Sequence, residues 1–317
     1  MKTFCIRRKE MGRRMKTSGI LTNAGKAKMK TSLQEFLIVV PALVFYLVFV
    51  IYPLIGGIYY SLTDWNGISA EYNVIGFKNY INLSQDSHVL EPLKNTFIYA
   101  FFTTILLNVL GLAMAIGVEK VIHGRAFFRS LLFIPSVLSA IVVGYIFNFI
   151  FSNVLSEIGE VLGATAMANN LLGSKQWALP MAILVDAWKG AGWYMVIYIA
   201  GLQNIDPSLY EAADISGATS WQKFWNVTFP LLAPAFTINM VLAVERAFKQ
   251  YDLVLALTGG GPGRASELIS MTIYNESFTN KRAGYGSALG VVLFLIIVII
   301  TLFQMKVLRR REENVRD

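Results

Sequence analysis

Six runs of apolar residues, each near the length that a membrane requires, dominate this sequence. A helix rises 1.5 Å per residue, so about 20 residues cross the roughly 30 Å of hydrocarbon in a bilayer. Continuous runs of this length in lipid are helices, because a helix satisfies every backbone group within its own segment. The runs are Gln34–Tyr60, Asn95–Val118, Ser130–Ser152, Trp177–Gln203, Leu231–Leu257 and Gly286–Lys306. The sequence therefore predicts an all-α integral membrane protein with six transmembrane helices.

The composition favours the same class of protein. The 317 residues are 55% hydrophobic and 15% charged, whereas soluble domains carry about 25% charged residues. The net charge of +8 does not indicate nucleic acid, because ten of the 28 Lys and Arg lie in the first thirty residues and five in the last twelve. Cys5 is the only cysteine, and His88 and His123 lack partners at ligand spacing, so neither a disulfide within the chain nor a metal motif is expected.

The distribution of basic residues predicts the orientation, since cytoplasmic loops of membrane proteins carry an excess of Lys and Arg. Placing the N-terminus inside also places 119–129, 204–230 and the residues from 306 onward inside, with 19 of the 28 basic residues. Both termini are then cytoplasmic. The expected parts are a basic extension at 1–32, a first transmembrane helix at 33–61, an extracytoplasmic loop at 62–92, a five-helix core at 93–306 and a basic tail at 307–317.

Between the fourth and fifth apolar runs lies a stretch built like soluble protein, Asp206–Pro234. Asp206 is expected to cap a helix that has proline at its first position. Gly217 suits the left-handed residue that ends a helix. Ser220 or Thr219 can cap a second helix, Trp221–Phe229, and Thr219 has a glutamine at capping-box spacing. The prediction is a helix, a glycine bend and a second helix, which by itself also fits an ordinary amphipathic connection between two spans.

This stretch resembles the EAA loop of type I ABC importer permeases, in the branch that carries sugars. The family pattern is roughly E-A-A-x-x-D-G-A, followed by an aromatic residue and two prolines four residues apart. The matching residues are Glu211, Ala212, Ala213, Gly217, Ala218, Phe224, Pro230 and Pro234. Ser216 replaces the usual Asp, which removes a charge but keeps a side chain able to accept a local hydrogen bond. The phrases at 248–252 and 257–262 also resemble sugar-type permeases, and the likeness covers roughly Leu93 to Lys306.

The resemblance implies the type I ABC importer permease fold and a subunit of an ATP-driven, binding-protein-dependent importer for oligosaccharides or related sugars. The implied partners are a second similar permease, two ABC ATPase subunits that bind ATP and Mg, and an extracytoplasmic solute-binding protein, all at a bacterial-type inner membrane. No cofactor on this chain and no nucleic acid are expected. Glycerol phosphate and polyamines remain alternative solutes.

In the family, the EAA loop is the element that docks in a cleft of the ATPase. The resemblance therefore implies ATPase coupling by the loop at 204–230. The residues implied in this coupling are Leu209, Tyr210, Glu211, Ala212, Ala213, Ser216, Gly217, Ala218 and Phe224.

The sequence contains no recognisable catalytic pattern. The glycine run at 259–263 lacks the Gly-Lys-Ser/Thr of a phosphate-binding loop and is expected to form a flexible turn on the outside. Neither a G-x-S-x-G elbow nor an H-E-x-x-H helix nor an EF-hand loop occurs. The chain is therefore predicted not to be an enzyme, to have no catalytic residues, and to depend on its partners for energy.

Charged residues inside the apolar runs are the remaining indication of function. Each costs about 2.5–3.5 kcal/mol at a helix centre, so each should face the bundle interior or a wet cavity. The pairs Asp186–Lys189 and Glu245–Lys249 have spacings that allow mutual neutralisation, whereas Arg246 has no opposite charge at i±3 or i±4. We expect Arg246 to line the translocation cavity or to pair with the partner permease.

With nearby aromatic residues, these charges form a candidate substrate pathway. Its members are Asp186, Trp188, Lys189, Trp193, Glu245, Arg246, Lys249 and Tyr251. Two alternatives stay open: the aromatic side chains serve only packing, or the charges form the ion relay of a secondary transporter or channel.

Overall fold

The computed structural model describes residues 36, 39–120, 123–163 and 170–316. The predicted basic extension at 1–32 lies outside these residues. Throughout the described ranges the chain is helical with short connections, and its extended pairing is a single isolated bridge between Thr63 and Val74. The all-α class is therefore confirmed.

The residues up to Tyr59 form a unit of their own. Its candidate membrane span, Val39–Tyr60, is 22 residues long and includes the π-helical turn η1 (Leu47–Ile51) and α2 (Tyr52–Tyr60). A span therefore lies where the first apolar run predicts one.

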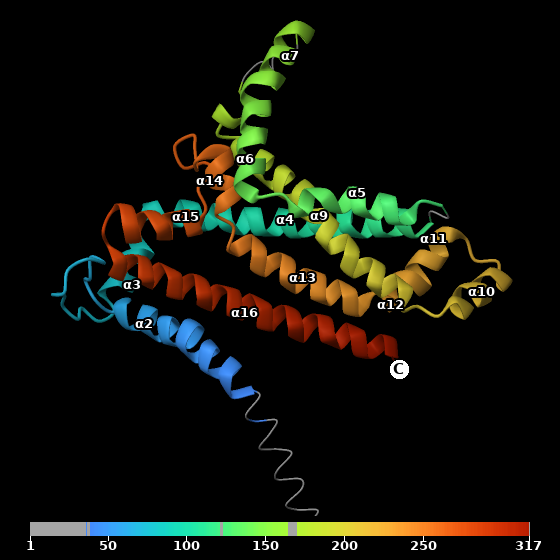
Figure 1. Ribbon diagram of the computed structural model, residues 1–317, viewed down its shortest axis with the longest axis horizontal. Helices are drawn as coiled ribbons and strands as arrows, with labels where there is room; N and C mark the ends of the chain where they lie inside the picture. Colours follow the sequence, from blue (N-terminus) through green and yellow to red (C-terminus); the bar gives the residue numbers. More distant parts are fainter. Residues whose placement is uncertain (1–35, 37–38, 121–122, 164–169, 317) are drawn as a thin grey trace, which may run out of the picture. The chain divides into compact units, whose positions relative to one another are not determined.

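The second unit, from Tyr60 onward, is built around four long helices. They are α4 (Ser87–Lys120), α9 (Ala178–Gln203), α13 (Ala233–Phe248) and α16 (Ala283–Arg316). Figure 1 shows α13 running between α4 and α16. Small residues let the helices approach closely: a Cβ on Gly111 of α4 would lie 2.9 Å from the Cβ of Tyr194 on α9. The fully buried side chains of Tyr99, Leu107 and Tyr198 fill the same α4–α9 contact.

The third apolar run does not form the single helix Ser130–Ser152 that the sequence predicts. It forms α5 (Arg125–Val137) and, after extended residues Leu138 and Ser139, α6 (Ala140–Phe149), which continues through η2 (Ile150–Val154) and α7 (Leu155–Leu162). Pro135 donates no backbone hydrogen bond, which weakens the turn just before the break. The candidate span is Ala140–Leu162, ten residues later in the sequence than the predicted start.

The fifth apolar run, Leu231–Leu257, is also interrupted, so its prediction as one continuous helix is wrong. The helix α13 ends at Phe248, and α14 (Asp252–Thr258) begins after Tyr251, whose φ of −141° is not helical. The hydroxyl of Ser270 donates to the carbonyl of Gln250, which satisfies a backbone group at the break.

Four helices in the described ranges are long and apolar enough to cross a membrane: Val39–Tyr60, α4, Ala140–Leu162 and Ala283–Arg310. A fifth candidate arises if Ser220–Leu231 and α13, which meet at a bend of 68°, count as one span. The charge-bearing α9 is 26 residues long but is not among these candidates.

The glycine-rich loop at 259–268 connects α14 to α15 (Ile269–Tyr274) and is held in place from α4. The Asn95 amide donates to the carbonyl of Arg264 at 2.9 Å, and the Thr96 hydroxyl accepts from the N–H of Ile269 at 2.9 Å. Within the loop, the Ser266 hydroxyl donates to the carbonyl of Gly261 at 2.6 Å. The expectation of a flexible turn is therefore corrected, because buried side chains of α4 fix this loop.

Candidate functional site: a coupling loop and an intramembrane pocket

The first helix of the predicted coupling loop is capped as its sequence requires. The helix α10 (Pro207–Ile215) begins at Asp206, whose carboxylate accepts from the N–H of Ser208 at 2.9 Å. This hydrogen bond, made to an exposed group, lowers the pKa of the Asp206 carboxyl. Proline at the first position costs nothing, because that N–H has no partner within a helix.

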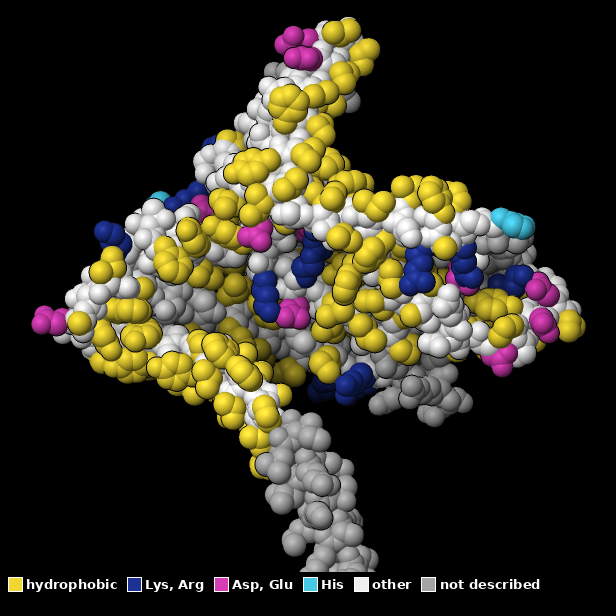
Figure 2. Space-filling model, viewed as in Figure 1, with side chains coloured by type: hydrophobic (Ala, Val, Ile, Leu, Met, Phe, Trp, Pro, Cys, Tyr) yellow, Lys and Arg dark blue, Asp and Glu magenta, His cyan; other side chains and the backbone are white. Residues whose placement is uncertain are grey.

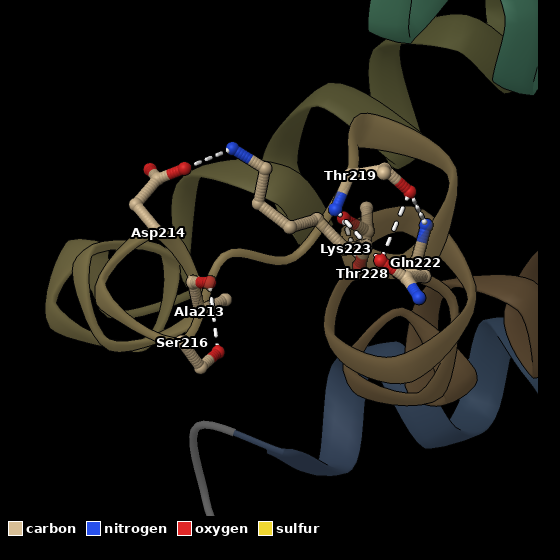
Figure 3. A network of polar contacts seen from close by, with 7 residues as sticks. All are labelled: Ala213, Asp214, Ser216, Thr219, Gln222, Lys223 and Thr228. Atoms are coloured by element: carbon tan, nitrogen blue, oxygen red, sulfur yellow. Dashed lines mark hydrogen bonds and ion pairs between the residues drawn. The ribbon is translucent and has the colours of Figure 1, made fainter.

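Gly217 ends α10 in the predicted left-handed conformation, with φ of 75°. The N–H of Ala218 donates to the carbonyl of Ala213 at 3.0 Å, and that of Gly217 to Asp214 at 3.0 Å, which together form a Schellman motif. Ser216 makes a local bond, but its hydroxyl donates to the Ala213 carbonyl at 2.9 Å instead of accepting. Figure 3 shows this bond beside the Asp214 side chain.

The second helix of the loop is also capped locally. Thr219 caps α11 (Ser220–Lys223), and Gln222 completes the predicted capping box. The helix continues through η4 (Phe224–Thr228) and α12 (Phe229–Leu231) into the bend before α13. An ion pair connects the two helices: Nζ of Lys223 lies 2.5 Å from Oδ1 of Asp214 (Figure 3). The loop is thus a helical hairpin with its own internal bonds.

The predicted coupling residues divide into an outer and an inner face of this hairpin. On the outer face, Leu209, Glu211, Ala212, Ser216 and Gly217 are exposed, and Ala213 and Ala218 are half-buried. On the inner face, Tyr210 and Phe224 line a pocket of about 560 Å³ together with Ile116 and Leu202. The Tyr210 and Thr228 hydroxyls lie 3.0 Å apart, which ties α10 to the second helix.

The two most exposed large apolar side chains on the loop were not among the predicted coupling residues. Ile215 is 89% exposed and Trp221 is 69% exposed, and both flank the glycine bend. A large apolar residue just before a helix-ending Ser-Gly pair, on a segment that is otherwise polar, is the sequence signal that points to Ile215.

A buried ion pair joins α9 to α13 in the interior of the second unit. Asp186 of α9 is fully buried and pairs with the guanidinium of Arg246 on α13. The Tyr99 hydroxyl of α4 donates to the same carboxylate at 2.8 Å. Three helices therefore meet at Asp186, and the predicted pairing of Asp186 with Lys189 is wrong, because Arg246 takes the carboxylate.

Arg246 thus pairs within its own chain. Gly190 makes this geometry possible, since a Cβ there would lie 2.5 Å from Nη1 of Arg246. The predicted pair Glu245–Lys249 is present, with Nζ 2.6 Å from the carboxylate.

The ion pair borders a pocket of about 380 Å³. The lining residues are Ser136, Lys189, Gly190, Trp193, Tyr194, Leu242, Glu245 and Arg246. Figure 2 shows basic and acidic side chains grouped within the apolar surface near the middle of the view. The structure therefore brings four of the predicted pathway residues together: Lys189, Trp193, Glu245 and Arg246.

The other predicted pathway residues lie elsewhere. Asp186 is buried behind Arg246, and Lys249 is 59% exposed beyond Glu245. Trp188 packs on Phe147 with ring centroids 5.2 Å apart, and Tyr251 packs on Tyr274 at 5.4 Å. Neither ring lines this pocket, and the pathway role of Trp188 and Tyr251 stays a prediction.

The pocket is also closed by residues that the sequence pattern did not single out. The Ser136 hydroxyl, at the end of α5, donates to the backbone carbonyl of Lys189 at 3.0 Å. Gly192 permits this approach, since a Cβ there would lie 2.5 Å from the carbonyl oxygen of Leu132. Among the residues that the structure describes, no group of three or more His, Cys, Asp or Glu is arranged to hold a metal ion.

Comparison with known proteins decides the family. Residues 107–314 match the sequence model of the binding-protein-dependent transport system inner membrane component. The chain belongs to this family. The permease is 37% identical over 295 residues to the probable starch degradation products transport system permease protein AmyD of Thermoanaerobacterium thermosulfurigenes, covering 91% of this chain and 99% of that protein.

Other similar proteins carry different names. The permease is 32% identical to the multiple sugar-binding transport system permease protein MsmF of Streptococcus mutans, over 87% of this chain and 94% of that protein. It is 29% identical to the sn-glycerol-3-phosphate transport system permease protein UgpA of Agrobacterium fabrum, with the same coverage. A solved bacterial ABC transporter for import of the acidic polysaccharide alginate has the same fold, with a TM-score of 0.77, 22% identity, and coverage of 89% of this chain and 97% of that one.

These findings establish the general role of the permease. It is an all-helical, inner-membrane permease subunit of a binding-protein-dependent ABC importer, with the type I fold. It is a non-catalytic transport component, and the ATPase resides on partner subunits.

Proposed function

We propose that the permease imports oligosaccharides or related sugars, with six transmembrane helices and both termini in the cytoplasm. The observation that carries the coupling part of this proposal is the self-capped helical hairpin at 206–231, which exposes Leu209 in its first turn and Ile215 beside the glycine bend. The sugar assignment is supported by AmyD and MsmF, which match nearly the whole chain. The proposed parts keep the bounds 1–32, 33–61, 62–92, 93–306 and 307–317.

The outer face of α10 docks in a cleft of an ABC ATPase subunit. When ATP binding closes the two ATPases, the hairpin moves with them as a nearly rigid body, because the Lys223–Asp214 and Tyr210–Thr228 contacts hold its helices together. The motion passes through the bend after Leu231 into α13, which carries Arg246 and one wall of the pocket. Energy from the ATPases thus reaches the solute pathway through packed helices.

The proposed complex contains a second similar permease and a solute-binding protein on the outer side. The exposure of the span Ala140–Leu162 supports a partner, because only 17% of its most apolar 18-residue stretch is buried within this chain. Exposed Ile141, Tyr145 and Phe149 of α6 offer the second permease an apolar surface.

Glycerol phosphate is the alternative solute. UgpA, at 29% identity, supports it, as does the presence of both Lys189 and Arg246 in the pocket lining. A secondary transporter driven through the intramembrane charges is the less favoured alternative, because four of the six charges in the fourth and fifth apolar runs are paired within the chain.

The test is purification of the complex from membranes through a tag on this chain, followed by reconstitution into proteoliposomes. We expect an ABC ATPase and a second permease to co-purify, and uptake of an oligosaccharide, maltotriose or oligogalacturonate, to require ATP and the solute-binding protein. Uptake of glycerol 3-phosphate but not of any sugar would show that glycerol phosphate is the solute. Uptake without ATP that an ionophore abolishes would contradict the importer assignment.

A further inference from the structure

The charges around the intramembrane pocket do not cancel. Asp186 pairs with Arg246, and Glu245 pairs with Lys249. Lys189 is half-buried, lines the pocket, and has no ion pair or hydrogen bond from its amino group to any other residue in the described ranges. One positive charge is therefore left over at this place.

This uncompensated charge lies near the middle of a helix. Lys189 is eleven residues from the start of the 26-residue α9, about 16 Å along the axis. An ionised side chain at such a depth faces a wet cavity and pairs with an opposite charge, since it is costly in lipid. Lys189 thus gives this pocket a net positive charge with which the acidic group of a solute can pair.

The surroundings of Lys189 fit a small polar solute. The pocket volume of about 380 Å³ falls in the range of roughly 300–1,000 Å³ that is typical of ligand sites. Trp193 is exposed beside Lys189 and offers an apolar ring face, while Arg246 is held in place by Asp186 and Tyr99. The site therefore combines one unpaired cation, one cation held by an ion pair and one flat aromatic surface.

We propose that this pocket binds the acidic group of its solute, a carboxylate or phosphate on a sugar or polyol, through Lys189 with Arg246 beside it. This inference rests on the proposed function and narrows the solute to an anionic carbohydrate. Asp186 acts as a positioning residue, because its carboxylate and the space above Gly190 set the guanidinium of Arg246 against the pocket wall.

The experiment measures the charge preference of the pocket directly in the assembled transporter. Cys5 is replaced by Ser, and Leu242, an exposed pocket residue, is replaced by Cys as a reporter. The reporter is then reacted with an anionic and a cationic methanethiosulfonate of similar size. We expect Lys189→Gln to lower the ratio of anionic to cationic reaction rates by about tenfold, since a unit charge several ångströms away favours the anionic reagent and disfavours the cationic one, and the two effects multiply in the ratio.

Matched variants separate the role of Lys189 from a general loss of charge. Lys189→Arg should keep the ratio, and Lys175→Gln, which removes a lysine from a different pocket, should leave it unchanged. Galacturonate or glycerol 3-phosphate should slow labelling of the reporter, whereas glucose at the same concentration should not. The stronger of the two anions identifies the carboxylate or the phosphate as the solute group.

An unchanged ratio in Lys189→Gln, or equal protection by glucose, would overturn the inference. A carboxylate from the second permease that neutralises Lys189 would give the unchanged ratio. ATP-dependent uptake of a neutral sugar alongside that result would leave the proposed function standing, whereas absence of ATP-dependent sugar uptake would remove it independently.

Discussion

At the scale of single residues, Asp186 makes the polar contacts that connect three helices of the interior. Its carboxylate accepts from Tyr99 and pairs with Arg246, so α4, α9 and α13 are joined by one side chain. The sequence showed that Asp186 and Arg246 lie in apolar runs and that Arg246 lacks a local partner. It could not show their pairing, because the two residues are 60 positions apart. Lys189, three residues after Asp186 on the same helix, was the nearer candidate partner.

Removal of one member of this pair is expected to cost more than removal of both. Asp186→Ala leaves the half-buried Arg246 without its counter-charge, so we expect a destabilisation below the roughly 3–5 kcal/mol of a fully buried pair. In Asp186→Ala/Arg246→Met no charge is stranded, and the loss should be well below the sum of the single losses. Thermal unfolding of the four detergent-purified proteins measures the cycle, and strictly additive losses would show that the pair is not coupled.

At the scale of elements, the coupling hairpin is the part that the sequence predicted best. Asp206, Gly217 and Thr219 specify caps that depend only on neighbours within a few residues, and the structure has all three. The helix breaks after Val137 and Phe248 could not be predicted in this way. They depend on distant contacts, such as the Ser270 hydroxyl on the Gln250 carbonyl and the close approach at Gly192.

Gly217→Val should impair coupling through the backbone alone. No atom lies within 4 Å of a Cβ built at Gly217, but φ of 75° is strained for a β-branched residue. Gly217→Asn is the matched control, because asparagine tolerates the left-handed region. We expect ATP-dependent uptake to fall severalfold or more in the valine variant and to stay near normal in the asparagine variant, with both proteins inserted in the membrane. Equal uptake by the two variants would contradict the role of this bend.

The loop at 259–268 gives a second prediction at this scale. Thr96→Val keeps the shape of the side chain but removes the acceptor for the buried N–H of Ile269, at a cost of about 1–3 kcal/mol. Hydrogen exchange in 259–269 should then become faster, while exchange in α10 stays unchanged. Unaltered exchange in the loop would mean that Thr96 does not hold it.

At the scale of the whole molecule, orientation is the property to test. In a variant with Cys5→Ser, a cysteine in place of Ile68, which is 73% exposed, should react with an impermeant maleimide in intact cells. A cysteine in place of Ile215 should react only after the membrane is permeabilised. Labelling of position 215 from outside would reverse the proposed topology.

The Asp186–Arg246 ion pair also has a consequence for biosynthesis. As α9 leaves the ribosome, Asp186 and Lys189 each carry an insertion cost of about 2.5–3.5 kcal/mol, and the arginine that neutralises the aspartate is still 60 residues from synthesis. The segment therefore gains its full stability in the bilayer only after α13 has arrived. We expect α9 to remain at the lateral gate of the translocon until then, so that nascent chains truncated before Arg246 cross-link to the insertion machinery and full-length chains do not.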